Sequence, residues 1–567
     1  MGSINNNDLP AFGGIISCKI LHVDYLAETY NQIKDKPNIK LYANTNNSIK
    51  SLTYYVFNDS SFLWTGGSDI KGFNETDFNY KELDRKFVYV DFSNGNLQIF
   101  TDHYSKIPLL YLFKNETLYF ASSLAFLLKL LGSDKINTDY NGLLLYFNYG
   151  FSFYDNSLIE GVESLAGGQC LSFIDGVLKK QSYTNFFDIR NYKINTNSLN
   201  QNIHLIDKYL LETTKRTIEN YNNIGITLSG GVDSGYLAQK INECGKSFNA
   251  YTLGFQDGYN EFDRIDYLSN TLNFKAQKII INPEQIISNY LEVSAYSSFP
   301  VGFNNSILNF IYKNAASDGI ELLFDGDGAD RLFLGMNKYL ELEHVLNLYA
   351  ITKKAKVHKI LTSFFKVVNH PISNKLWFYF MKFNNDFPFY GERQLQSNLT
   401  FNKSFEIKLN DLALPKELKE LSGNIDDWLF FSLFSVYFTP AFFFHTPYEL
   451  QLKHNIVSNP QFWSDNLVNL ALNIPTNQKF KNKTTKYVLR EAAKLKIDDG
   501  YWDLSKIGLQ NSYNYLKNSK IGLEFVNSYV GMIKASDEYK YLKESLPVNE
   551  VDAERLLPYY IWKERLF

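Results

Sequence analysis

Two hydrophobic patterns follow each other along the chain and change near residues 190–200. Up to about residue 190, short apolar-rich segments such as 86–92 and 97–101 are separated by polar breaks. The break between these two, at 93–96, reads Ser-Asn-Gly-Asn, which is typical of a hairpin turn. The first part of the chain is therefore predicted to consist of strands and turns.

From residue 199 onward the pattern predicts strands that alternate with helices. A long helical pattern covers 199–221, and the chain beyond 340 is mainly helical in pattern. The alternation between them favours a parallel sheet with helices on both faces. We expect strands at 224–228, 248–253, 277–281 and 321–324, and helices at 236–241 and 262–272.

The length and charge of the chain limit the classes of protein to which it can belong. A chain of 567 residues is too long for one core, so we expect two domains, at residues 1–190 and 200–567. Hydrophobic residues make up 45% and charged residues 21%, as in a globular protein. The net charge is -3 and no long run of one sign occurs, which argues against a nucleic-acid partner bound through a basic surface.

Two further features concern the cellular environment. The nearly apolar segment 428–444 is short for a bilayer and contains Pro440, so we expect a buried helix and no membrane span. The chain has three cysteines, an odd number, and they lack the spacing of metal ligands. They are Cys18, Cys170 and Cys244. This argues against a disulfide framework or a zinc site and favours a cytoplasmic protein.

The segment 228–235, LSGGVDSG, lies between a predicted strand and a predicted helix. Its backbone N–H groups and the helix N-terminus can therefore face an anion such as phosphate. Gly230 and Gly231 permit a close approach, while Ser229 and Ser234 add hydroxyl donors. Asp233 would repel phosphate unless a divalent cation lay between them, so it is a candidate Mg²⁺ ligand. The alternative is a Ser/Gly turn that only caps a helix.

The residues 229–234, SGGVDS, resemble the SGGxDS signature of the PP-loop ATP pyrophosphatases, which cleave ATP between the α and β phosphates. The strand before the signature and the helix after it lie where that family has them. The resemblance implies ATP contacts at Leu228, Ser229, Gly230, Gly231, Asp233, Ser234 and Leu253.

A second segment, 324–335, reads FDGDGADRLFLG and resembles the SGxGxDExFxGY motif of asparagine synthetases and β-lactam synthetases. The resemblance implies that Asp330 is the second Mg²⁺ ligand and that Gly326 lies against the nucleotide. Asp327 falls where asparagine synthetases have a Glu that handles the attacking amine. Asp325 and Arg331 depart from the family pattern, which has Ser and an acid there. An acidic, Gly-rich turn is the alternative.

Two lysines complete the predicted site. Residues 481–490, KNKTTKYVLR, resemble the family's KxxLR helix, which implies that Lys486 contacts the nucleotide. Residues 505–508, SKIG, resemble its RPKxG motif, which implies that Lys506 meets the phosphates and is catalytic. Cleavage at the α-phosphorus spreads negative charge over phosphate oxygens, which a fixed ammonium and Mg²⁺ offset.

The N-terminal part carries the same resemblance. Segments 100–111, 120–123 and 158–168 are similar to the RDxxGxxPLYY, FASE and GIxxLxPG motifs of asparagine synthetases. The implied fold is an α+β sandwich of glutaminase (Ntn) type, followed by an α/β PP-loop ATP pyrophosphatase domain with a helical C-terminal part.

The glutaminase nucleophile is missing from this pattern. The family begins MCGI, and its N-terminal Cys needs the free amine as base, whereas residues 12–16 read FGGII with Gly13 in that place. We therefore expect no ammonia from glutamine. β-Lactam synthetases and lasso-peptide cyclases share this loss, and both let an amine of the same molecule attack an acyl-adenylate.

The expected activity is ATP-dependent amide formation through an acyl-adenylate, with AMP and pyrophosphate released. Our first choice of product is a macrolactam on a carboxylate-bearing precursor peptide, with the aromatic-rich region 375–445 as a candidate for a large pocket. The resemblance alone implies a leader-binding or protease partner. The alternatives are a small-molecule amide ligase, including β-lactam closure, and a non-catalytic nucleotide-binding scaffold. Arg331 and the altered PFLD-like segment 462–465 favour the scaffold or an unusual substrate. Sulfur transfer is disfavoured because paired cysteines are absent.

Overall fold

The structure is a computed structural model. It describes residues 11–17, 31–36, 39–43, 53–58, 61–65, 79–81, 83–92, 96–132, 136–149, 157–184, 195–256, 258, 260–335, 338–368, 370, 372–373, 376–377, 380, 440–497, 500–504, 511–545 and 553–566. Within these residues, no helix is both long and apolar enough to cross a bilayer. Most of the segment 428–444, the hairpin residues 93–95 and most of the region 375–445 lie outside them.

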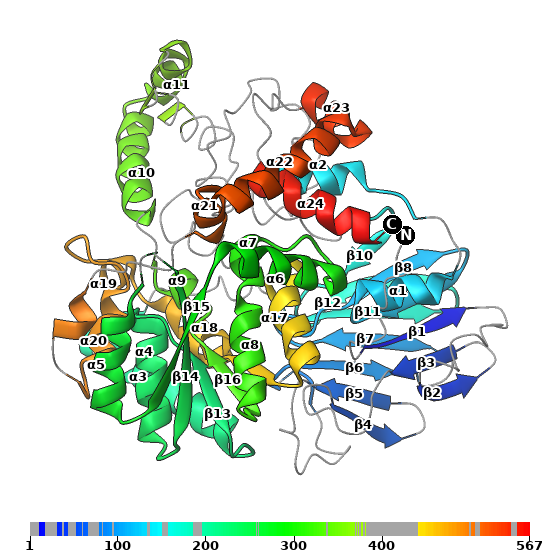
Figure 1. Ribbon diagram of the computed structural model, residues 1–567, viewed down its shortest axis with the longest axis horizontal. Helices are drawn as coiled ribbons and strands as arrows, with labels where there is room; N and C mark the ends of the chain where they lie inside the picture. The colour runs from blue at the N-terminus through cyan, green and yellow to red at the C-terminus, as the bar shows by residue number, and fades with distance from the viewer. Residues whose placement is uncertain are drawn as a thin grey trace.

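The N-terminal part contains two six-stranded antiparallel sheets, and their inner faces share one core (Figure 1). Phe12 of one sheet stacks on Trp64 of the other, with ring centroids 4.5 Å apart. The strand prediction at 97–101 is confirmed, while helices α1 (Leu124–Leu131) and α2 (Tyr140–Tyr149) were not predicted. In spatial order, the first sheet is β10 (Val162–Ser164), β8 (Leu110–Lys114), β9 (Thr117–Ala121), β1 (Phe12–Ser17), β3 (Ile39–Ala43) and β2 (Asn31–Lys36); the second is β12 (Val177–Ser182), β11 (Gln169–Ile174), β7 (Leu97–Thr101), β6 (Phe87–Asp91), β5 (Ser61–Thr65) and β4 (Thr53–Asn58).

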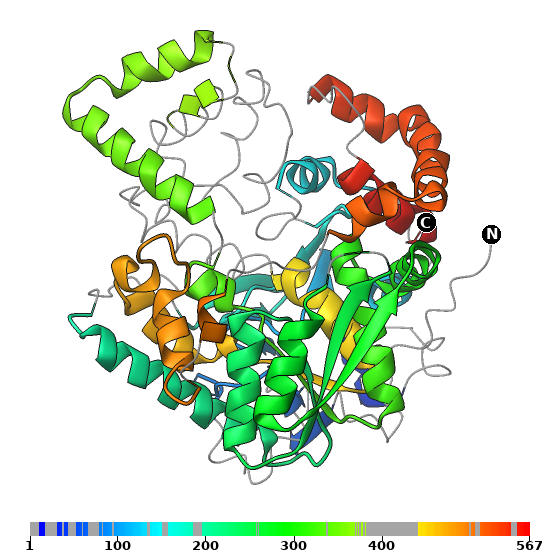
Figure 2. The ribbon, with the colours of Figure 1, turned by 60° about the vertical axis from the view of Figure 1, so that its left-hand side comes forward.

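The C-terminal part contains a five-stranded sheet in which every neighbouring pair is parallel. Helices cover both faces of this sheet, as the alternating pattern predicts (Figures 1 and 2). The predicted strands and helices between 224 and 324 are all present within a few residues. The spatial order is β15 (Lys275–Ile281), β14 (Phe248–Phe255), β13 (Ile224–Thr227), β16 (Leu322–Asp325) and β17 (Val457–Pro460).

The chain order of these strands reverses direction at β13. Strands β14 and β15 extend the sheet on one side of β13, whereas β16 and β17 extend it on the other. In open parallel sheets, ligands bind outside the carboxyl ends of the strands at such a reversal. The loops that follow β13 and β16 are therefore the expected place for a ligand.

Helices connect and surround the sheet. The chain beyond 340 is helical among the described residues, as predicted, apart from strand β17. The helices of this part are α3 (Leu199–Ile218), α4 (Val232–Glu243), α5 (Phe262–Leu272), α6 (Pro283–Tyr296), α7 (Phe303–Ser306), α8 (Leu308–Ser317), α9 (Ala329–Leu332), α10 (Lys338–Lys354), α11 (His358–Val367), α17 (Pro440–His454), η7 (Gln461–Trp463), α18 (Asp465–Asn473), α19 (Thr476–Lys479), α20 (Tyr487–Ala493), η8 (Gly500–Asp503), α21 (Ser512–Lys517), α22 (Lys520–Ala535), α23 (Asp537–Ser545) and α24 (Ala553–Leu566).

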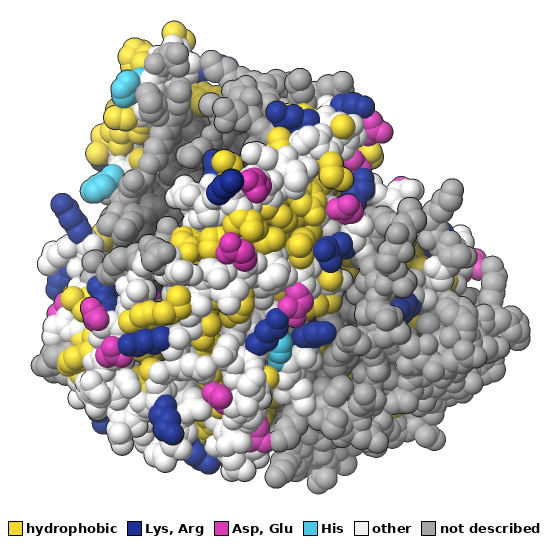
Figure 3. All heavy atoms as spheres, viewed as in Figure 1, with side chains coloured by type: hydrophobic (Ala, Val, Ile, Leu, Met, Phe, Trp, Pro, Cys, Tyr) yellow, Lys and Arg dark blue, Asp and Glu magenta, His cyan; other side chains and the backbone are white. Residues whose placement is uncertain are grey.

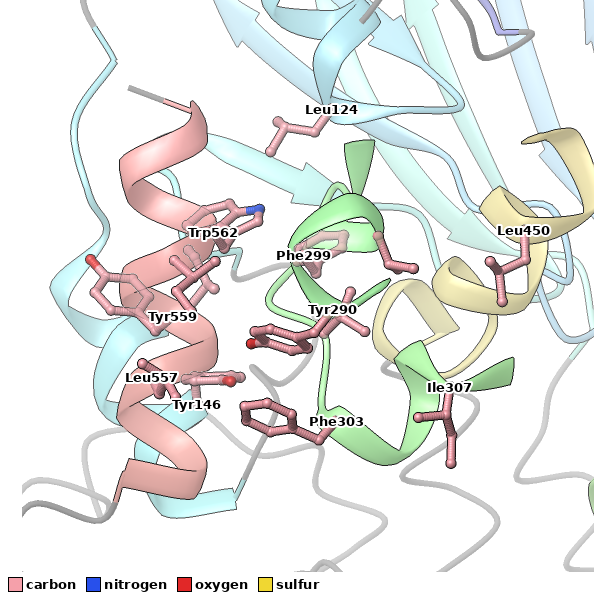
Figure 4. Packing of buried hydrophobic residues seen from close by; sticks show 14 of the residues in the cluster. Leu124, Tyr146, Tyr290, Phe299, Phe303, Ile307, Leu450, Leu557, Tyr559 and Trp562 are labelled. Carbon is pink, nitrogen blue, oxygen red and sulfur yellow. The ribbon is translucent and has the colours of Figure 1, made fainter. Parts of the chain in front are cut away.

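One apolar cluster joins the two parts of the chain. It contains Leu124 and Tyr146 from the N-terminal part and Tyr290 from α6. Side chains of α24, such as Tyr559, close the cluster (Figure 4). The Tyr559 ring lies edge-on to Phe147, with 5.6 Å between the ring centroids. Because buried apolar contacts dominate folding free energy, the two parts are held as one body.

Candidate nucleotide-binding site

The loop after β13 turns directly into α4, so the N-terminus of the helix lies at the carboxyl end of the sheet. The Ser234 hydroxyl holds this loop in shape: it accepts from the Ser229 N–H at 3.0 Å and donates to the Ser229 carbonyl at 2.9 Å. Gly231 caps the helix without a side chain of its own to accept from the first-turn N–H groups. A helix N-terminus of this kind attracts an anion.

The loop after β16 lies directly against the loop after β13. A Cβ added to Gly326 would lie 3.1 Å from Asp233 Cβ and 3.1 Å from Ser234 N, so a larger side chain would push the two loops apart. Gly328 has φ +97°, a conformation that disfavours side chains, and it allows the chain to turn into α9. The structure thus brings Gly326 against the loop that holds Asp233 and Ser234, while its contact with a nucleotide stays a prediction.

A lysine from a distant segment joins the two predicted metal ligands. Lys486 Nζ forms an ion pair with Asp233 and a second one with Asp330 Oδ1 at 2.6 Å. Its side chain is only 3% exposed, so the ammonium is held between the two carboxylates. Lys486 itself has φ +54° at the start of α20, which aims its side chain back toward the loops. The site therefore favours a positive charge between Asp233 and Asp330.

These carboxylates fit a divalent cation of the Mg²⁺ type. Mg²⁺ is usually held by one or two carboxylates together with substrate phosphates and water, rather than by a cage of protein ligands. No group of three or more His, Cys, Asp or Glu side chains suited to a metal occurs among the described residues. Asp233 and Asp330, beside the N-terminus of α4, supply the one or two carboxylates that Mg²⁺ needs when phosphates and water are its other ligands.

Asp325 and Asp327 form a second acidic pair beside the site. The Asp327 N–H donates to Asp325 Oδ1 at 2.9 Å, and the Ser458 hydroxyl donates to Asp325 Oδ2 at 3.2 Å. Burial, and then repulsion by Asp327, raise the pKa of Asp325. Burial also raises the pKa of Asp327, although solvent weakens this effect because the side chain is exposed. Trp463 Nε1 donates to Asp327 Oδ2 at 3.1 Å and fixes the orientation of that carboxylate.

The sequence did not point to Glu261 and Arg264, which also lie at the phosphate loop. The Gly230 N–H donates to Glu261 Oε2 at 3.1 Å, so a carboxylate already occupies part of the anion-binding loop. A Cβ added to Gly230 would lie 2.9 Å from Arg264 Cδ, and Arg264 is ion-paired to Glu261 at 3.3 Å. The sequence feature that could have indicated this pair is Arg264, an arginine in the first turn of the helix that follows β14.

The other predicted residues lie as follows. Leu228 and Leu253 are buried, 2% and 8% exposed, in two different apolar clusters. Their side chains therefore belong to the core, and only their backbone groups are candidates for nucleotide contact. Lys506 and its motif, 505–508, lie outside the described residues.

Family models match both parts of the chain. The model described as asparagine synthase matches residues 205–403 and 452–521, and the model described as a glutamine amidotransferase domain matches residues 80–184. A curated relative, glutamine-hydrolyzing asparagine synthetase 1 of Bacillus subtilis, is 24% identical over 245 residues, which cover 41% of this chain. The two parts of the chain are therefore similar to two domains of an asparagine synthetase-like family. The match spans only 36% of the length of that relative.

Solved structures similar to this chain include two synthetases. NMN synthetase from Francisella tularensis has 18% identity and a TM-score of 0.18, with 24% of this chain and 58% of that chain covered. NH3-dependent NAD synthetase from Campylobacter jejuni has 16% identity and a TM-score of 0.20, with 34% of this chain and 98% of that chain covered. At these TM-scores neither structure defines the fold of this chain.

In the amidotransferase-like part, Gly13, the residue that the sequence motif aligns with the family's nucleophile, lies in the interior of a strand. Gly13 lies within β1 and pairs with Tyr42 of β3 and Ala121 of β9. A residue paired on both sides inside a strand does not offer the free amine that a terminal nucleophile uses as its base. The loss of this nucleophile stays a prediction from the sequence.

Polar contacts hold the amidotransferase-like part against the asparagine synthetase-like part close to Trp463. His103 Nδ1 lies 2.7 Å from Asp465 Oδ2. Burial lowers the pKa of His103, but the hydrogen bond and charge of Asp465 outweigh it and raise the pKa. Lys86 donates to Gln451 Oε1 at 3.1 Å and also to the Ser458 carbonyl. The N-terminal part thus contacts the segment that orients Asp327.

Proposed function

We propose that this protein is an ATP-dependent carbon–nitrogen ligase that forms an amide and releases AMP and pyrophosphate. The observation that supports it most is the convergence of Asp233, Asp330 and Lys486 at an anion-binding helix N-terminus. A plain Ser/Gly helix cap has no need of a buried lysine between two carboxylates, because such a group costs desolvation energy. Binding of a nucleotide and its Mg²⁺ would explain why the lysine and the two carboxylates lie together here.

In the proposed reaction, a substrate carboxylate oxygen attacks the α-phosphorus of ATP and pyrophosphate leaves, which gives an acyl-adenylate. An amine then attacks the acyl carbon, and AMP leaves as the amide forms. Ser229, Gly231 and Ser234 would bind the phosphates through N–H and hydroxyl groups, and Asp233 and Asp330 would hold Mg²⁺. When bound, Mg²⁺ offsets negative charge on the phosphates.

Asp327 is the candidate acceptor for the proton that the amine loses. A raised pKa makes its carboxylate a stronger base, and the hydrogen bond from Trp463 keeps it in one orientation. By family resemblance, Lys506 would offset the charge that develops on the phosphates. The same proposal includes three further points. The N-terminal sandwich is of Ntn type, its role is structural, and the protein is cytoplasmic.

We favour a macrolactam on a precursor peptide as the product. The absence of a Cys at position 13 supports an amine from the substrate itself rather than ammonia from glutamine. Asp325 and Arg331 differ from the asparagine synthetase pattern beside the proposed amine-handling residue, which supports an unusual substrate. A leader-binding or leader-cleaving partner is part of this proposal.

The test is an incubation with MgATP and a panel of carboxylates, including peptides with a free N-terminus and an Asp or Glu side chain. Phosphorus NMR identifies the nucleotide products and mass spectrometry the organic ones. Loss of one water from a single peptide, with AMP and pyrophosphate, supports macrolactam closure. Two joined molecules with the same nucleotides would favour a small-molecule ligase.

The matched variants are Asp233→Asn in the site and Asp266→Asn on the surface, where Asp266 pairs with Lys278 and is half exposed. Asp233→Asn should lower the rate of ATP–pyrophosphate exchange at least about a hundredfold, because charge stabilisation of this kind is worth that much. Asp266→Asn should leave it unchanged. ATP binding without any turnover would favour the scaffold, and equal rates in the two variants would contradict the assigned site.

A further inference from the structure

Helices α10 and α11 form a hairpin that projects from the body of the molecule. Figures 1 and 2 show the two helices extending away from the parallel sheet, with α11 farthest from it. The turn between them is fixed, because Lys356 has φ +58° and the Val357 N–H donates to the Thr352 carbonyl at 3.0 Å. We call α10 and α11 together the helical arm.

One side of the helical arm has its own small aromatic core. The ring of Phe380 lies edge-on to Tyr349 of α10 at 5.3 Å and to Phe365 of α11 at 5.4 Å. Tyr349 and Phe380 are buried. These contacts fix which side of α11 faces inward.

The other side of α11 presents an apolar stripe to solvent. Val357, Ile360, Phe364 and Val367 are 39%, 69%, 58% and 83% exposed. Their spacing of three, four and three residues places them on one side of a helix with 3.6 residues per turn. Hydrophobic side chains are visible along the outer edge of the arm in Figure 3. None of the residues of α11 is buried, which is unusual for a helix of a globular protein.

Lysines accompany this apolar stripe along the helical arm. Between Glu343 and Asp386 the sequence has no acidic residue and seven lysines, although the whole chain carries a net charge of -3. The described lysines of the arm are exposed, and Lys353 also lies 5.9 Å from the centre of the Tyr349 ring. These lysines are Lys353, Lys354, Lys356, Lys359 and Lys366.

We propose that the helical arm docks on an anionic lipid surface, with α11 in the interfacial plane. Its apolar stripe would enter the boundary between headgroups and acyl chains, and the lysines would contact the headgroup phosphates. Lysine suits this position because its apolar stem lies along the hydrocarbon while the ammonium stays in water. The stripe lies on the solvent-exposed side of a projecting helix, which fits a planar lipid surface better than a peptide.

The ten residues of α11 offer too little apolar surface for stable binding to neutral lipid, so the lysines and anionic headgroups have to contribute. Each lysine near an anionic surface is worth about a fivefold change in affinity. We therefore expect binding that depends on lipid charge and weakens as salt concentration rises.

The test is co-sedimentation of the full chain with sucrose-loaded vesicles, of phosphatidylcholine alone or in equal parts with phosphatidylglycerol. Binding should occur with the mixed vesicles only. Phe364→Ser should weaken it roughly tenfold through lost apolar contact. Replacing Lys353, Lys354 and Lys356 together by glutamate should weaken it by on the order of a hundredfold. The assay needs no ATP turnover, so it stands apart from the proposed ligase activity.

The matched control is Ile280→Ser, because Ile280 is 57% exposed on β15, outside the arm. This variant should bind mixed vesicles like the unaltered protein. Equal binding to both vesicle types, or no binding at low salt, would overturn the proposal. So would binding of an acidic peptide by the arm with no binding of vesicles, or self-association that Phe364→Ser abolishes without any vesicle binding.

Discussion

Replacing Lys486 by methionine would remove the ammonium that lies between Asp233 and Asp330 and leave two carboxylates facing each other. Loss of one partner from a buried ion pair costs about 3–5 kcal/mol. Asp330 is 32% exposed, so solvent compensates part of that loss, and we expect a cost of about 2–3 kcal/mol. For a domain of this size such a cost lowers Tm by roughly 5 °C.

Magnesium should reverse this loss. Without the lysine, Mg²⁺ no longer competes with an ammonium for the two carboxylates, and at a hundred times its Kd it stabilises the folded state by about 2.7 kcal/mol. In the unaltered protein Mg²⁺ must compete with the ammonium, so its effect on Tm should be smaller. The assay is thermal unfolding, followed by fluorescence, over a titration of Mg²⁺ in the absence of nucleotide.

Lys494→Met is the matched control. Lys494 forms ion pairs with Glu491 and Asp503 near the surface, and Asp503 is 59% exposed, so its loss should cost less than about 1 kcal/mol. That loss should not respond to Mg²⁺. If Mg²⁺ raised the Tm of Lys486→Met no more than that of the unaltered protein, the reasoning that the lysine occupies the cation position would be wrong.

Gly335→Ala should cut ATP–pyrophosphate exchange at least about tenfold, because a Cβ there would lie 2.0 Å from Asp330 Oδ1 and 2.1 Å from Lys486 Cε; Gly531→Ala, which meets open space, should change nothing. The raised pKa of His103 stabilises the folded protein fully below about pH 6.5, and this share is lost as pH rises through the folded pKa. Tm measured across pH should therefore show the largest deficit of His103→Gln near about pH 6 and a smaller one near about pH 9, and a constant deficit would contradict this. If Gly13 stands in place of the nucleophile, as the sequence predicts, the protein should release no glutamate from glutamine in a coupled assay; measurable release would refute that inference.

The elements around the phosphate loop could be predicted because their local pattern agrees with their place in the fold. The strand at 224–227 is a short apolar run, and the Gly-rich turn and helix that follow it carry their own signals. Strand β17 could not be predicted in the same way. It has four residues, VSNP, and its last one is Pro460, so neither alternation nor length distinguishes it from a loop.

The contacts within the site were harder to predict from the sequence than the helices and strands, because they form only in the tertiary structure. Motif order placed Lys486 near the nucleotide, but its position between Asp233 and Asp330 depends on a lysine at φ +54°, which no local preference predicts. The hydrogen bond from Trp463 to Asp327 joins residues 136 positions apart. Such contacts follow from how β16 and β17 pair, and that pairing is not encoded in either strand alone.

The shared apolar cluster has a consequence for how the protein is made. Leu124 and Leu556 pack into the same core, yet about 430 residues separate them, which is roughly 20–90 s of synthesis on the ribosome. During that interval α6 can already pack on α1, but the part of the cluster that α24 closes stays exposed, and aggregation competes with folding. Incomplete chains of this protein should therefore aggregate more readily than the finished chain, because the finished chain alone can bury the whole cluster.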